Sequence, residues 1–240
     1  MKKITMTLLA LAAGAFLRAE DTVQTSSYSV TMDFPYVSKY VFRGLECGND
    51  AIQPSVELSV GNGYVGVWTS QPIEHNDDNE FDFYAGYKLD LNDQWSLDLG
   101  TTVYTYPELD NGPGVNDTTV ETYLGINGDI SGIKPGAYVY YDWTLESWTG
   151  QVQLGYSYPL KDIGVSLDFS GSFGGVIRKN EAGVPSVDEA DYLYWSLGTQ
   201  ANYTLSEKAS LYAGIAYTSN DLKRVEGNFW VFTAGLSVGF

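Results

Sequence analysis

Apolar and polar residues alternate with a period of two along most of the chain, a pattern typical of β-strands with two chemically different faces. The final segment is the clearest case. Every second residue from Trp230 to Phe240 is apolar, and the residues between them become small or polar from Thr233 onward. The pattern places an aromatic residue at the end of a strand, on the same face as the other large apolar side chains.

The same alternation recurs along the chain and predicts twelve strands. The first covers 27–34, is interrupted by Pro35 and continues over 36–44. The other eleven cover 51–60, 63–70, 80–90, 94–106, 118–128, 134–143, 147–158, 163–173, 190–205, 208–218 and 228–240. An even number of strands returns both ends of the chain to one side of a closed barrel.

The connections between these strands alternate between long polar segments and tight turns. Long segments follow the odd-numbered strands, at 71–79, 107–117, 174–189 and 219–227. Tight turns follow the even-numbered strands, at 61–62, 91–93, 129–133, 159–162 and 206–207. This asymmetry is typical of an all-β, antiparallel transmembrane β-barrel with short periplasmic turns and longer extracellular loops. The connection at 145–146 is short for an outer loop.

The strand register predicts which side chains face lipid and which face the interior. In the segment 80–90, Phe83 and Tyr87 point outward while Glu80, Asp82 and Lys88 point inward. A charge on the lipid face near the midplane costs about 2–4 kcal/mol for Lys or Arg, so a slip of one residue is excluded. The alternative, a soluble barrel with an apolar interior, needs more side-chain volume than twelve strands supply.

Aromatic residues near the strand ends predict two interfacial girdles. The group toward the long loops is Tyr104, Tyr106, Tyr141, Trp143, Trp148, Tyr192, Tyr194 and Trp230. The group toward the tight turns is Tyr64, Trp95, Tyr158, Tyr203 and Phe240.

The N-terminus has the form of an export signal. Lys2 and Lys3 precede an apolar stretch that is too short to span a bilayer. We expect a signal peptide over 1–19 with cleavage after Ala19, or alternatively after Ala15. Residues 20–240 then form a single barrel domain in the outer membrane of a Gram-negative bacterium.

Net charge and cysteine content narrow the function classes. The formal net charge of −17 argues against nucleic acid as a partner. The single Cys47 cannot form an internal disulfide.

The predicted pore-lining residues are the charged side chains on the inward face. They are Asp33, Lys39, Arg43, Glu57, Glu80, Asp82, Lys88, Asp98, Glu121, Asp142 and Asp168. Acids outnumber bases among them, which favours cations in a water-filled lumen. The alternative is that Arg43 and Lys88 pair with Glu57, Glu80 or Asp82 and fill the interior with salt bridges.

The long loops are also acidic. Their charged residues are Glu74, His75, Asp77, Asp78, Glu108, Asp110, Asp117, Glu181, Asp188 and Glu189. Such oxygen clusters can bind divalent cations, but their spacing matches no calcium loop. His75 is the only histidine, and a rim hydrolase would need it with Ser or Asp partners. We therefore expect no catalytic residue, no cofactor and no metal site.

The segment 38–44 reads Ser-Lys-Tyr-Val-Phe-Arg-Gly, and Ala-Ile-Gln-Pro follows at 51–54. Together with 64–68, 83–87 and the terminal Phe, it resembles the TorF-type porin family. The resemblance implies an outer-membrane pore in which Arg43 is the matching lumen residue. Leu45-Glu46-Cys47 replaces the Ser- and Gln-rich stretch expected after the Arg-Gly pair.

Alternation and resemblance together predict a porin-like channel for passive diffusion of small hydrophilic solutes or ions. Its partners would be outer-membrane lipid and lipopolysaccharide. The alternative is a non-conducting structural or adhesive barrel whose acidic loops bind lipopolysaccharide through divalent cations. The transported solute, the pore size, the oligomeric state and the role of the loop at 174–189 stay open at this point.

Overall fold

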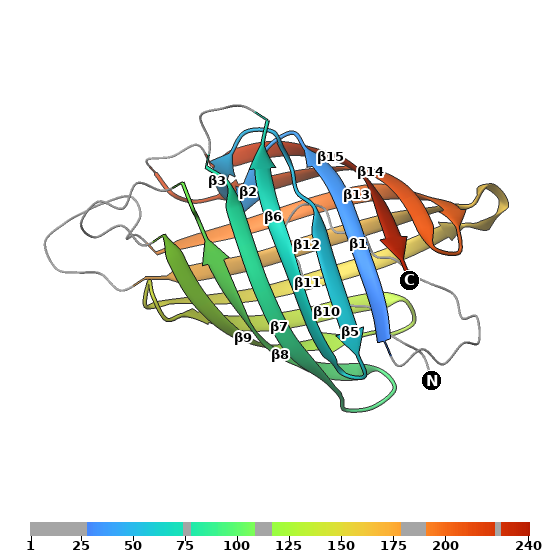
Figure 1. The fold of residues 1–240 in the computed structure, drawn as a ribbon, viewed down its shortest axis with the longest axis horizontal. Coiled ribbons are helices and arrows are strands. Elements are labelled where there is room, and N and C mark those ends of the chain that lie inside the picture. The colour runs from blue at the N-terminus through green and yellow to red at the C-terminus, as the bar shows by residue number, and fades with distance from the viewer. Residues whose placement is uncertain (1–27, 74–77, 109–116, 179–190, 224–226) are drawn as a thin grey trace, which may run out of the picture.

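A computed structural model describes residues 28–73, 78–108, 117–178, 191–223 and 227–240. These residues form one closed barrel of antiparallel strands (Figure 1). No helix within them is long and apolar enough to cross a membrane. The predicted signal peptide over 1–19, with cleavage after Ala19 or Ala15, lies outside them.

Twelve strands form the wall, with one of them broken in two. They are β1 (Tyr28–Val37), β4 (Ala51–Ile52) with β5 (Ser55–Val60), β6 (Gly63–Pro72), β7 (Glu80–Asp90), β8 (Trp95–Thr105), β9 (Thr118–Gly128), β10 (Ile133–Asp142), β11 (Ser147–Leu160), β12 (Val165–Ile177), β13 (Tyr192–Ser206), β14 (Ala209–Asn220) and β15 (Asn228–Gly239). A short 3₁₀ turn, η1 (Lys161–Ile163), joins β11 to β12. The predicted twelve-stranded antiparallel barrel is confirmed.

Pairing between β1 and β15 closes the barrel. The register runs from Thr31 opposite Gly239 to Val37 opposite Thr233. Both described chain ends therefore lie at one end of the barrel, which we call the turn end. We call the opposite end, where β1 ends and β15 begins, the loop end (Figure 1).

The predicted course of the first strand is wrong in two respects. The strand continues through Pro35 as far as Val37, because Pro35 lies where the neighbouring strand is itself broken at Gln53 and Pro54. At this point the carbonyl of Pro35 still accepts a hydrogen bond from the Gln53 N–H at 2.8 Å. The chain then leaves the wall, and residues 40–42 do not extend the strand.

Exposure along the wall follows the predicted faces. Phe83 and Tyr87 on β7 are each 54% exposed, whereas Glu80 and Asp82, on the other face of the same strand, are 4% and 7% exposed. Large apolar residues are exposed on one side of every wall strand, which is the surface a bilayer would cover.

The predicted girdles are correct only in part. Tyr141, Trp143 and Trp148 form an outward cluster at the loop end, with ring centroids of Tyr141 and Trp148 4.6 Å apart. Five other residues of the predicted girdles face the interior instead: Tyr64, Tyr104, Tyr106, Tyr192 and Tyr194. The prediction used only the nearness of these residues to a strand end. Their position in the two-residue period of each strand already indicated that they point inward.

Inward tyrosines lie flat across glycines of the neighbouring strand. Tyr84 pairs directly with Gly66, and a Cβ on Gly66 would lie 2.3 Å from the Tyr84 ring. Gly66 pairs in turn with Glu57, so the Tyr84 hydroxyl reaches that carboxylate at 3.4 Å. The same arrangement recurs in two more rows: Asp98–Gly125–Tyr138 and Gln151–Gly174–Tyr194. Each row is an inward polar residue, a glycine and a tyrosine on three successive strands.

We expect Gly66→Ala to lower the free energy of unfolding by about 1–3 kcal/mol, because the new methyl group overlaps the Tyr84 ring and lies 2.7 Å from the Val56 carbonyl oxygen. Urea unfolding of protein folded into lipid vesicles measures the change. Gly150→Ala is the matched control, since a Cβ there meets no atom within 4 Å. Equal stability of the two variants would contradict the packing role of Gly66.

Candidate functional site: a hairpin inside the barrel

A short hairpin separates β1 from β4 and forms a sheet of its own. Its strands are β2 (Tyr40–Phe42) and β3 (Leu45–Gly48), which pair only with each other. Arg43 and Gly44 form the turn, with φ values of 48° and 78°. Two successive positive φ values are characteristic of a type I′ hairpin turn, in which glycine is favoured and arginine is uncommon.

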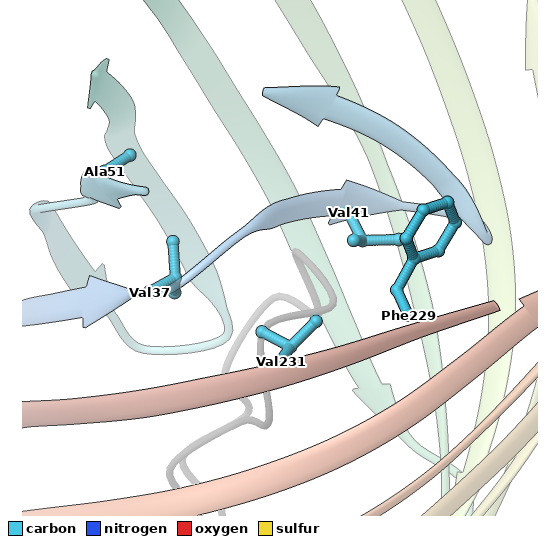
Figure 2. Close-up of a cluster of buried hydrophobic side chains, with 5 residues drawn as sticks. All are labelled: Val37, Val41, Ala51, Phe229 and Val231. Carbon is cyan, nitrogen blue, oxygen red and sulfur yellow. The ribbon is translucent and has the colours of Figure 1, made fainter. Parts of the chain in front are cut away.

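An apolar cluster fixes the root of the hairpin at the loop end. It joins Val37 and Val41 to Ala51 and to Phe229 and Val231 of β15 (Figure 2). The Ser38 N–H also donates to the Phe232 carbonyl at 2.9 Å. These contacts turn the chain inward directly after β1.

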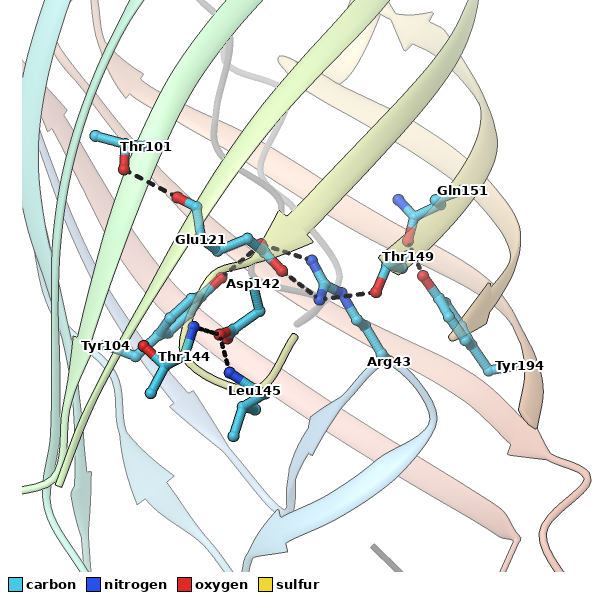
Figure 3. A network of polar contacts seen from close by, with 10 residues as sticks. All are labelled: Arg43, Thr101, Tyr104, Glu121, Asp142, Thr144, Leu145, Thr149, Gln151 and Tyr194. Carbon is cyan, nitrogen blue, oxygen red and sulfur yellow. Dashed lines mark hydrogen bonds and ion pairs between the residues drawn. The ribbon is translucent and has the colours of Figure 1, made fainter. Parts of the chain in front are cut away.

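Arg43 carries the tip of the hairpin to the opposite wall. Its guanidinium makes two hydrogen bonds of 2.8 Å to Glu121 on β9 and one of 3.2 Å to Thr149 on β11 (Figure 3). The guanidinium also lies over the rings of Phe42 and Tyr140, 4.5–4.6 Å from their centroids. A bidentate pair of this kind holds both distance and orientation.

The turn also contacts the strands on the side of β13 and β14. The Asn220 side chain donates to the Gly44 carbonyl at 2.6 Å. A Cβ on Gly44 would lie 2.7 Å from the Tyr194 Cβ, so only glycine fits. Leu45 packs against the buried cluster of Val176, Tyr192 and Tyr194.

Aromatic contacts complete the ring of neighbours. Tyr40 packs against Trp68 of β6, and Phe42 packs against Tyr104 of β8, with ring centroids 5.6 and 6.1 Å apart. The hairpin therefore contacts wall strands on every side, from β6 around to β15, and occupies part of the barrel interior near the loop end.

All eight predicted inward acids face the barrel interior; Glu80 and Asp82 lie beside each other, but the eight do not form one cluster. Four are held by neutral donors along the wall: Asp33 by Tyr212, Glu57 by Ser59 and Tyr84, Asp98 by Tyr64 and Tyr138, and Asp168 by Ser157 and Asn202. Asp142 accepts the backbone N–H groups of Thr144 and Leu145 at 2.7–2.8 Å. These hydrogen bonds stabilise the short turn at 143–146. Asp142 was predicted only as a pore-lining residue, so this structural role was not foreseen.

The three predicted bases also have separate partners. Arg43 pairs with Glu121, and not with Glu57, Glu80 or Asp82 as the sequence alternative supposed. Lys39 is at the hairpin root and pairs with Glu46 of β3. Lys88 is at the turn-end half of β7, where it interacts electrostatically with Glu57 and Asp98 and lies 4.9 Å from the Tyr64 ring centroid.

Sequence reasoning missed the hairpin and the tyrosines that hold the acids. Two signals were available. An Arg-Gly pair between the β-formers Phe42 and Leu45 is compatible with a two-residue turn, and the inward parity of Tyr64 and Tyr194 is visible in their strands. The partners Thr149 and Asn220 carry no such signal, because nothing local relates them to Arg43.

Family comparison assigns the chain to a bacterial group. A family model described as "Bacterial protein of unknown function (Gcw_chp)" matches residues 21–233. The chain belongs to this family. No curated protein matches the sequence.

Solved structures share the barrel of this Gcw_chp chain. NanC porin is 13% identical with a TM-score of 0.57, covering 87% of this chain and 98% of its own. KdgM porin is 11% identical with a TM-score of 0.55, covering 88% and 99%. An outer membrane channel from Pseudomonas putida F1 is 8% identical with a TM-score of 0.54, covering 91% and 97%. At these identities the likeness shows the fold, which is that of bacterial outer-membrane porin barrels.

The described residues hold no cluster of three or more His, Cys, Asp or Glu side chains that could bind a metal. Of the predicted loop residues, Glu74, His75, Asp77, Asp110, Glu181, Asp188 and Glu189 lie outside the described part of the chain, as does most of the loop at 174–189. Within the described part, the Asn79 side-chain amide donates a hydrogen bond of 2.7 Å to the Glu108 carboxylate, which links two neighbouring connections at the loop end.

We expect Arg43 and Glu121 to be energetically coupled. Their side chains are 12% and 4% exposed, and removing one partner of a buried pair costs about 3–5 kcal/mol because the other charge is left unpaired. Arg43→Ala/Glu121→Ala should therefore lose less stability than the sum of the two single variants. Urea unfolding in lipid vesicles completes the double-mutant cycle.

The control is the cycle of Lys39→Ala and Glu46→Ala, whose side chains are 27% and 31% exposed. Its coupling should stay below about 1 kcal/mol. Additive losses in the Arg43–Glu121 cycle would show that the ion pair does not hold the hairpin.

Proposed function

We propose that this protein is an outer-membrane channel for passive diffusion of small hydrophilic solutes, with the β2–β3 hairpin as its constriction. The observation that carries the proposal is the ion pair between Arg43 and Glu121, which holds the hairpin inside the barrel near the loop end. The fold shared with NanC porin, KdgM porin and the Pseudomonas channel supports it. So does the resemblance of 38–44 to the TorF-type porin family.

The charge of the interior supports a preference for cations. The predicted pore-lining residues include eight acids and three bases, and of these bases Arg43 interacts with Glu121 and Lys88 with Glu57 and Asp98. The Arg43 charge is already neutralised by Glu121. An ion passing the hairpin would therefore meet a net negative wall.

Location follows from the same features. The apolar outer surface would contact outer-membrane lipid, with the loop end and its lipopolysaccharide on the outside and the turn end in the periplasm. A cleaved signal over 1–19 would supply export. Small solutes or ions would be the ligands of the lumen.

A second candidate is a non-conducting structural barrel. The observation that favours it is the same hairpin, because contacts with β6 through β15 leave less of the interior open at the loop end. The acidic loops would then bind lipopolysaccharide through divalent cations. Conductance separates the two candidates.

We expect discrete current steps when the refolded protein is placed in a planar bilayer, with a cation-selective reversal potential under a potassium chloride gradient. A heat-dependent gel shift first confirms that the barrel is folded. Arg43→Ala should shift the reversal potential further toward cation selectivity, because it removes a positive charge and frees Glu121. A folded barrel that never conducts would overturn the channel proposal, and an unchanged reversal potential in Arg43→Ala would overturn the constriction.

We also expect Cys47 to report on the constriction. It is the only cysteine of the chain, lies exposed on β3 and is close enough to Glu80 to interact electrostatically. A positively charged methanethiosulfonate reagent should lower the single-channel conductance of the wild type and reduce its cation selectivity. Cys47→Ser is the control and should not respond. Modified wild-type protein with unchanged current would place the hairpin outside the conduction path.

A further inference from the structure

Glu80 and Asp82 differ from the other acids of the interior. They are consecutive inward residues at the loop-end start of β7, 4% and 7% exposed. Their carboxyl groups lie close enough to hydrogen-bond to one another, and Glu80 is also bonded by the hydroxyls of Tyr40 and Tyr106. The pair therefore lies between the hairpin and the wall.

No described cation neutralises this pair. Arg43 pairs with Glu121, and Lys39 pairs with Glu46. Lys88 is at the other end of β7, beside Glu57 and Asp98. Two adjacent carboxylates thus share a largely buried position with no positive partner, which is unfavourable unless a proton or a cation joins them.

An unpartnered oxygen marks the same position independently. Oδ1 of Asp82 is buried and has no hydrogen-bond partner. The acids held along the wall, such as Asp33 and Asp98, have tyrosine hydroxyls for this purpose. No protein group donates a hydrogen bond to Oδ1 of Asp82 in the way that these tyrosine hydroxyls do.

The donor set indicates the chemistry of the missing partner. Carboxylate and phenol oxygens are hard ligands, and Mg²⁺ typically binds one or two carboxylates while keeping several of its waters. A fully protein-built calcium site would need more oxygens, and the described residues contain no group of three or more His, Cys, Asp or Glu side chains placed to hold a metal ion. We propose that Glu80 and Asp82 form a site for one partly hydrated divalent cation of the Mg²⁺ type, beside the hairpin.

Isothermal titration with Mg²⁺ of the refolded full chain in neutral phosphatidylcholine vesicles tests the site. We expect saturable binding to the wild type and a rise in its unfolding midpoint with Mg²⁺ concentration. Glu80→Gln and Asp82→Asn should each weaken binding about tenfold or more, because each removes one of two ligands. Asp90→Asn, which removes a carboxylate from the other end of the same strand, should leave affinity unchanged.

A second measurement does not depend on variants that fail to fold. Mn²⁺, as a paramagnetic substitute, should broaden the spectrum of a nitroxide attached to Cys47 of otherwise wild-type protein. Absence of Mg²⁺ heat or of Mn²⁺ broadening would overturn the site and leave a shared proton between the two carboxyl groups. Binding that persists in Glu80→Gln/Asp82→Asn would overturn it in favour of the loop acids. Neither readout requires conduction, so failure of the site and failure of the channel proposal are distinguishable.

Discussion

The interior of this barrel depends on tyrosine hydroxyls that reach carboxylates across a glycine. A carboxylate buried without a donor is costly, and the interior contains far fewer bases than acids. Glycines such as Gly66 and Gly125 let the rings lie flat, so that Tyr84 and Tyr138 reach Glu57 and Asp98 two strands away. The rows give these acids neutral hydrogen-bond donors beside the electrostatic interaction with Lys88, and they keep large side chains close to the wall.

At the hairpin, by contrast, a buried acid is neutralised by a base. Arg43 brings a positive charge to Glu121, and the unusual backbone of the turn, worth about 1–3 kcal/mol of strain, is maintained by contacts on all sides. Gly44 is needed at the point where the turn meets Tyr194. One ion pair therefore decides where the interior is narrowed, and the apolar cluster at Val37 and Phe229 decides where the chain enters.

The alternation of apolar and polar residues was enough to predict the strands of the barrel wall, because lipid on one face and charged groups on the other enforce a period of two. The segment 118–128, for example, was predicted with the same bounds as β9. The hairpin was not predictable in the same way. Residues 40–42 are strong β-formers, and the period does not say which strand they join. Their place is set by Glu121, 78 residues further along the chain, which no local pattern relates to Arg43. The same limit applies to the Glu80–Asp82 pair: its inward direction was predicted, but the lack of an ion-pair partner among the described residues was not.

The hairpin is enclosed by strands that come later in the chain. Its turn binds Thr149 and Asn220, 106 and 176 residues away, and the surrounding wall closes only when β15 pairs with β1. Such distant contacts are slow to form, because the entropy of long loops is lost before the contacts are gained. The full set of contacts around one of the earliest segments therefore exists only once the last strand has paired with the first, and afterwards that segment cannot pass through the wall without breaking its hydrogen bonds.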